Sequence, residues 1–196
     1  MRKLLDIGIE QMKKMIGEMA NGSVEALESA RKSIEGDFDS TEEISRRLHI
    51  MRSDVLELAT ELLVRYSPVA SDLRFIQSAI DVSYDLYRIS RYAMEIERTA
   101  RIVKGPVELS KKAFPLTEEA VRLSVDAFRE LDETLVGRLF ELDRVIDDYY
   151  LKSLNTLNES PEKAADALIM RHLERISDHA KEIGAKVVYI KEGRRV

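Results

Sequence analysis

An eleven-residue pattern occurs twice in this chain, and this repetition most strongly constrains the fold. The pattern L-x-R-I-S-x-x-A-x-E-I spans residues 86–96 and again residues 173–183. Each copy lies downstream of a Ser-Pro pair, Ser67-Pro68 or Ser160-Pro161, that is typical of a turn before a helix. Self-similarity of this kind indicates a duplicated structural unit. We therefore predict two successive, pseudo-symmetric three-helix bundles, over residues 1–104 and 105–196.

The spacing of apolar residues is helical throughout, and only 8 Gly and 4 Pro interrupt the 196 residues. The sequence therefore predicts an all-α fold with six principal helices. The first is expected to stop at Asn21-Gly22, with Ser23 capping a short extension, and Met12, Met15 and Met19 form a stripe that we assign to its core face. The other predicted segments are 40–66 with a capping box at Ser40, 68–105, 117–131 with an Asp132-capped continuation, 142–157, and 160–191 with Ser160 as N-cap.

Composition excludes several classes of protein. The formal net charge is -5 and the pI is about 5.4, so no general basic surface is available to hold nucleic acid directly. Cysteine is absent, which rules out disulfides and thiolate metal sites. No apolar run reaches a membrane span, and residues 1–20 do not resemble a signal peptide. We expect a soluble, cytoplasmic protein that meets membranes only through partners.

Two pairs of carboxylates share helix faces in the second half. Asp143 and Asp147 are four residues apart, as are Glu174 and Asp178. The midpoints of the two pairs are equally far from Ser160-Pro161, so antiparallel helices would bring all four carboxylates to one height. Such a cluster requires cations. These are either a metal ion that accepts oxygen ligands or basic side chains, for which the candidates are Arg144, Arg171 and Arg175.

No other constellation in the sequence predicts chemistry. Phosphate-binding glycine loops, nucleophile elbows and H-E-x-x-H motifs are missing, so we predict that the chain is not an enzyme. A metal-dependent hydrolase using the carboxylates is the weaker alternative. His172 and His179 flank the second carboxylate pair, but we assign them to packing or surface rather than to metal ligation.

The segment 172–180, H-L-E-R-I-S-D-H-A, resembles the L-E-R-I-G-D-H-A signature of PhoU-type phosphate-uptake regulators, with Ser177 where that family favours Gly. Residues 68–74 resemble the P-x-A-x-D-L-R opening of the family's third helix. Residues 143–147 match its D-x-x-x-D motif. The similarity extends over almost the whole chain.

The resemblance implies two pseudo-symmetric three-helix bundles and, in some members, multinuclear metal on E(D)-x-x-x-D clusters. The metal implied by the resemblance is iron or zinc, whereas the oxygen ligands alone also suit manganese or magnesium. Asp143, Asp147, Glu174 and Asp178 are therefore candidate ligands for iron, zinc, manganese or magnesium. The resemblance also implies a cytoplasmic, often dimeric regulator of phosphate transport and phosphate-starvation signalling, which contacts the ATPase of the phosphate ABC transporter and its sensor kinase. The alternative function is a helical scaffold or transcription-linked adaptor of another pathway.

The first half departs from the family pattern. The positions aligned with the acidic pairs carry Thr41 and Ser45 on one helix and Tyr87 and Arg91 on the other. A cation at residue 91 replaces a candidate ligand, so we expect a first metal site to be absent or rebuilt from neighbours such as Asp37, Asp39 or Asp85. The sequence predicts a single metal site, in the second half.

Overall fold

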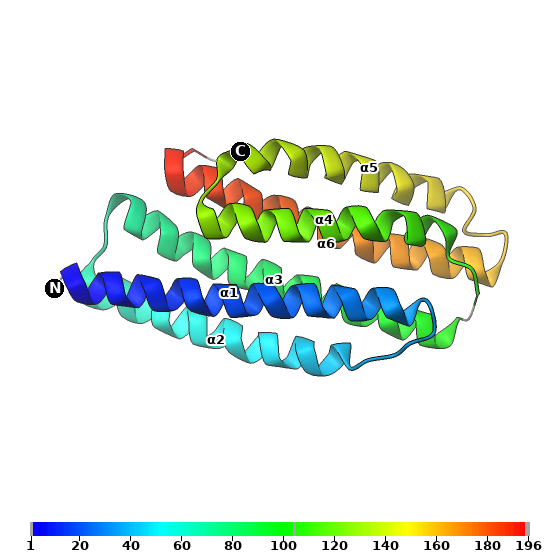
Figure 1. Ribbon diagram of the computed structural model, residues 1–196, viewed down its shortest axis with the longest axis horizontal. Coiled ribbons are helices and arrows are strands. Elements are labelled where there is room, and N and C mark those ends of the chain that lie inside the picture. The colour runs from blue at the N-terminus through cyan, green and yellow to red at the C-terminus, as the bar shows by residue number, and fades with distance from the viewer. Residues whose placement is uncertain (1, 104, 195–196) are drawn as a thin grey trace.

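The computed structural model describes residues 2–103 and 105–194, and no strand occurs within these ranges (Figure 1). The all-α prediction is confirmed. The elements, in chain order, are α1 (Arg2–Ser33), α2 (Thr41–Tyr66), α3 (Ala70–Ile102), α4 (Glu108–Glu130), the 3-10 helix η1 (Glu133–Leu135), α5 (Val136–Leu154) and α6 (Pro161–Glu192). None of these helices has the length and apolarity needed to cross a bilayer.

The helices form two groups of three, as the repeat predicts. Helices α1, α2 and α3 pack on one another, and so do α4, α5 and α6. The groups meet through the long helices α3 and α6 and through a smaller contact of α1 with α4, while α2 and α5 lie at opposite edges (Figure 1). Arg74, near the start of α3, donates a hydrogen bond to the carbonyl of Ile190, near the end of α6, over 2.9 Å. Helices α3 and α6 are therefore antiparallel.

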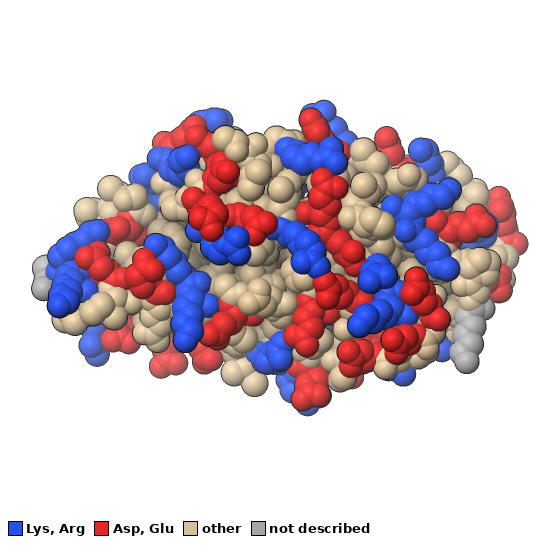
Figure 2. Space-filling model, viewed as in Figure 1, with Lys and Arg blue, Asp and Glu red and all other residues tan. Residues whose placement is uncertain are grey.

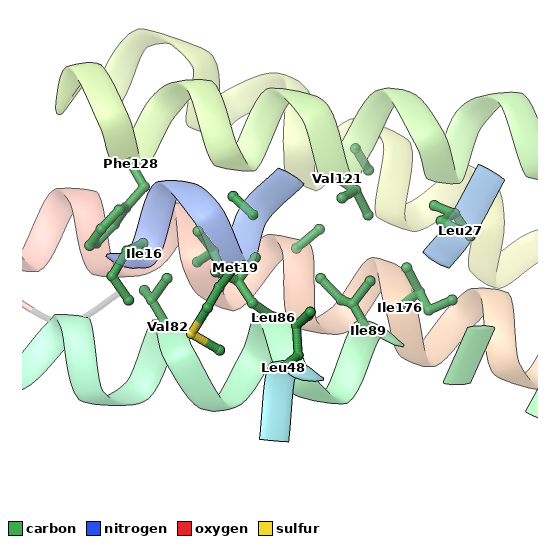
Figure 3. Close-up of a cluster of buried hydrophobic side chains, with 14 of the residues drawn as sticks. Ile16, Met19, Leu27, Leu48, Val82, Leu86, Ile89, Val121, Phe128 and Ile176 are labelled. Atoms are coloured by element: carbon green, nitrogen blue, oxygen red, sulfur yellow. The ribbon is translucent and has the colours of Figure 1, made fainter. Parts of the chain in front are cut away.

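One continuous apolar core joins the two groups. Figure 3 shows Met19 of α1, Leu86 of α3, Val121 of α4 and Ile176 of α6 converging on a common interior. Met12 and Met19 are fully buried and Met15 packs against the same cluster, which confirms that the methionine stripe belongs to the core. Because this core contains residues of both halves, it does not separate them into two domains, and the predicted division between residues 104 and 105 stays a prediction.

The expected end of the first helix at Asn21-Gly22 is wrong, because α1 continues to Ser33. Gly22 is buried where α1 crosses α2, and a Cβ placed there would lie only 2.5 Å from Leu48 Cδ1. This glycine permits a close helix crossing rather than ending a helix. Ser23, expected as a cap, donates instead to the carbonyl of Ala20 within the same helix (2.8 Å).

The expected start of the fourth helix near Thr117 is also wrong, because α4 begins at Glu108 and includes Pro115. Its start is stabilised from α6, where buried Asp166 accepts hydrogen bonds from the backbone N–H groups of Leu109 (3.0 Å) and Ser110 (2.9 Å). These bonds satisfy N–H groups that a helix start leaves without partners.

The remaining helix ends follow the sequence more closely. Ser160 Oγ accepts from the backbone N–H of Lys163 over 3.2 Å, as predicted, and α6 ends before Gly193, whose φ of 75° is left-handed. Asp132 caps η1, as predicted for the continuation of the fourth helix. Helix α5 follows η1 directly, so it begins at Val136 rather than at the predicted Leu142, and it ends at Leu154 rather than at the predicted Leu157. Helix α2 begins beside Ser40, but the Ser40 side chain makes no capping bond.

Candidate functional site: a carboxylate cluster between two helices

The four predicted carboxylates lie where α5 packs against α6. Asp143 and Glu174 are buried, with 5% and 6% of their surfaces exposed, whereas Asp147 and Asp178 are partly exposed. Ser177 Oγ of α6 donates to Asp143 Oδ1 of α5 over 3.0 Å, which places the centres of the two acidic pairs level with each other. The structure thus brings together the side chains that the spacing predicted.

Lys181, which the sequence analysis did not single out, links the two acidic pairs. Its ammonium group donates to Asp143 Oδ2 on α5 and to Asp178 Oδ1 on α6, the latter over 3.2 Å. Burial lowers the pKa of Lys181, but the hydrogen bonds and charges of Asp143 and Asp178 outweigh it, so the pKa is raised overall. The ammonium group therefore stays charged between the helices.

Two arginines neutralise the other end of the cluster. Arg175 Nε donates to Glu174 Oε2 (2.6 Å), and the same guanidinium pairs with Asp178 Oδ2 (2.8 Å). Arg171 also donates to Glu174 Oε2, over 2.7 Å. Hydrogen bonding to Glu174 raises the pKa of Arg175. Arg144, the third predicted partner, is exposed and makes no ion pair with any residue in the described ranges.

Asp147 is the exception in this cluster. Within residues 2–103 and 105–194 it has neither a hydrogen-bond nor an ion-pair partner for its side chain. Burial raises its pKa, and the negative charges of Asp143 and Glu174 raise it further, against the opposing effect of Lys181. Asp147 is therefore repelled by the neighbouring carboxylates, and no basic side chain of the described residues forms an ion pair with it.

The described geometry does not fit a metal ion. Carboxylate oxygens of Asp143, Glu174 and Asp178 are engaged by the chain's own basic groups. Across the described part of the chain, no group of three or more Asp, Glu or His side chains is arranged to hold a metal. The assignment of the four carboxylates as ligands for iron, zinc, manganese or magnesium stays a prediction from the sequence.

His172 and His179 lie at the α3–α6 contact rather than among these carboxylates. His179 Nδ1 is 2.8 Å from Asp85 Oδ1, and the Tyr92 ring centroid is 5.8 Å from that of each histidine. Burial lowers the pKa of His172, whereas it raises that of Asp85 against the effect of His179. Both histidines pack between the halves, in line with the packing assignment.

The first half has a different register from the one expected. Ser90 Oγ lies 3.3 Å from Ser45 Oγ, in the manner of the Ser177–Asp143 bond, so Ser45 rather than Thr41 is the counterpart of Asp143. Thr41 sits at the start of α2, where its backbone N–H donates to Glu97 over 3.1 Å. The prediction that Thr41 and Ser45 occupy the positions equivalent to Asp143 and Asp147 is therefore wrong, by about one helical turn.

This shift places His49 where the second half has Asp147. The ring of His49 lies 5.2 Å from that of Tyr87, the counterpart of Glu174. The guanidinium group of Arg91 forms an ion pair with Glu95 Oε1 on the same helix, over 3.5 Å. The suggested replacement ligands are dispersed: Asp37 and Asp39 lie in the α1–α2 loop, and Asp85 pairs with His179. They do not form a rebuilt first site in the described residues.

Comparison with known proteins shows one family across the whole fold. A family model described as the PhoU domain matches residues 9–100 and 111–187. An Archaeoglobus fulgidus protein called a phosphate-specific transport system accessory protein PhoU homolog is 32% identical over 188 residues, covering 92% of this chain and 91% of the relative. A Thermotoga maritima protein called a PhoU homolog 1 of that system is 30% identical over 212 residues, covering 98% and 88%.

The solved structures agree with this assignment. The crystal structure of PhoU from Pseudomonas aeruginosa superposes with a TM-score of 0.78 at 26% identity, covering 98% of this chain and 97% of that one. PhoU from Streptococcus pneumoniae shares the fold, with a TM-score of 0.75 at 18% identity and coverage of 98% and 99%. Both halves, the repeated motif and the overall arrangement lead to one conclusion: this chain belongs to the PhoU family.

Proposed function

We propose that this chain is an accessory regulator of phosphate uptake that acts by protein contact rather than by catalysis. The observation that carries the proposal is that the PhoU domain match includes both halves, residues 9–100 and 111–187. Relatives that align over most of their length are named accessory proteins of the phosphate-specific transport system. A chain that keeps both halves retains the whole architecture on which such a role depends.

The proposed partners are the ATPase subunit of a phosphate ABC transporter and its sensor kinase, met in the cytoplasm by a homodimer of this chain. A regulator without its own chemistry alters a partner only through different affinities for the partner's two states. Lys, Arg, Asp and Glu side chains are interspersed over the face shown in Figure 2. Such a mixed-charge surface suits reversible, orientation-specific contacts, since charge complementarity contributes specificity more than affinity.

Deleting the gene tests the proposal. We expect phosphate-starvation genes to stay active and cells to accumulate phosphate in phosphate-rich medium, because the transporter and sensor lose their restraint. Restoring the intact chain should reverse both effects. A pull-down with the restored, tagged chain should recover the transporter ATPase or the sensor kinase. Unchanged expression and uptake, together with recovery of neither component, would favour a scaffold or transcription-linked adaptor in another pathway.

A further inference from the structure

We propose that Lys181 is a built-in counter-cation that takes the place of a metal ion between α5 and α6, so that the second half is neutralised by its own side chains. This inference concerns the cluster alone and goes beyond the proposed function. The starting point is a difference between sequence and structure. The sequence predicts a metal ion among the four carboxylates, but in the described residues basic side chains already pair with Asp143, Glu174 and Asp178, and no metal-binding group is arranged there.

Lys181 makes the connection that a shared cation would make. Its ammonium group binds one carboxylate on each helix, Asp143 of α5 and Asp178 of α6, and its side chain is only 23% exposed. An ammonium group is a compact charge with three donors, so it can serve both helices at once. Arg175 extends the bridge along α6 from Asp178 to Glu174.

A divalent ion would have to displace this ammonium group before it could use Asp143 and Asp178 together. The lysine is tethered one turn along from Asp178, so its local concentration is fixed by the fold and exceeds that of a dissolved ion. Displacement would also leave a partly buried lysine without its two partners, which is unfavourable. The lysine therefore disfavours metal without closing the site to solvent.

The first half supports this assignment independently. In the repeated pattern Met94 occupies the position of Lys181, and it is buried, with 2% of its surface exposed. On the facing helix Ser45 occupies the position of Asp143. The carboxylate and the lysine are thus both present in one half and both replaced by neutral residues in the other. If the lysine were only a solvated surface residue, its presence would not need to match the presence of the carboxylate on the facing helix.

The test compares the wild-type chain with Lys181→Gln and with a control, Lys186→Gln. The control lies further along α6 and removes an ion pair with Asp81 of α3. Thermal unfolding is followed after EDTA treatment and again with manganese chloride. We expect neither treatment to move the wild-type Tm. Lys181→Gln should lose about 5 °C and recover most of it with manganese, because the ion replaces the missing ammonium group. Lys186→Gln should show no response to manganese.

Elemental analysis of purified wild-type protein keeps the test decisive even if Lys181→Gln does not fold. We expect well under one metal ion per chain. A stoichiometric metal content, or a wild-type Tm that falls in EDTA, would overturn the proposal in favour of the metal predicted from sequence. A folded Lys181→Gln that manganese stabilises no more than Lys186→Gln would overturn it as well. None of these outcomes depends on phosphate control, so failure here and failure of the proposed function can be distinguished.

Discussion

Two glycines on α1 have opposite roles although they lie five positions apart. Gly22 faces α2, and a Cβ there would meet Leu48, which is fully buried. Gly17 faces open space, because an added Cβ would have no neighbour within 4 Å. Glycine inside a helix costs about 0.5–1 kcal/mol relative to alanine. That cost is offset at Gly22 by the close helix crossing, but it has no such compensation at Gly17.

Alanine substitutions should therefore change stability in opposite directions. Gly22→Ala should lower the free energy of unfolding by about 1 kcal/mol, since overpacking against Leu48 exceeds the gain in helix propensity. Gly17→Ala should raise it by about 0.5–1 kcal/mol. Urea unfolding of the two variants beside the wild type measures both effects, and each variant is the control for the other. Stabilisation by both substitutions would show that α2 moves away from α1 easily.

Helix ends in this chain depend on side chains from other helices. Asp166 of α6 caps α4, and Glu97 of α3 accepts from the first backbone N–H of α2. Each of these contacts joins residues more than fifty positions apart in sequence. The local sequence around Ser40 and Thr117 does not reveal such distant partners, which is why the capping box at Ser40 and the start of α4 near Thr117 are wrong predictions.

Asp166→Ala should destabilise the chain by about 2–3 kcal/mol, because buried N–H groups at the start of α4 would lose a charged acceptor. The first turns of α4, ahead of Pro115, should also exchange their amide hydrogens faster than in the wild type. Asp126→Ala is the matched control on α4, since Asp126 forms an exposed pair with Arg129. Equal losses of stability in the two variants would contradict a capping role for Asp166.

The candidate site was predictable to the extent that it depends on spacing within helices. The acidic pair on α5 and the acidic pair on α6 lie at similar heights because they are nearly equally far from the turn that joins the two helices, and helical rise converts that distance into height. Lys181 could not be identified from the sequence, because α6 is rich in charged residues and nothing near residue 181 in the sequence indicates that its ammonium group reaches α5. The first-half register was misjudged for a related reason: without carboxylates there, only the Ser45–Ser90 contact identifies the matching positions.

At the scale of the whole molecule, the repeated motif forms the seam between the halves. Leu86 of α3 and Leu173 of α6 occupy equivalent positions in the motif, and both belong to the shared core. They are almost fully buried, with 1% and 0% of their surfaces exposed. Duplication has thus placed the same apolar residue of α3 and of α6 in the core that the two halves share, where each half covers surface that the other would expose.

Because of this seam, the two halves should unfold together. Leu86→Ala and Leu173→Ala should each cost about 2–5 kcal/mol, as expected for cavities in a packed core. The chain contains no Trp, so Tyr66→Trp on α2 and Tyr150→Trp on α5 provide one fluorescent probe in each half. Either leucine variant should shift the urea midpoints of both probes equally, and both should coincide with the loss of helical circular dichroism. A shared core transmits the loss of one buried side chain to every helix that packs on it, so both probes should report the same destabilisation. If Leu86→Ala shifted the urea midpoint of only the probe at residue 66, the halves would be independent domains.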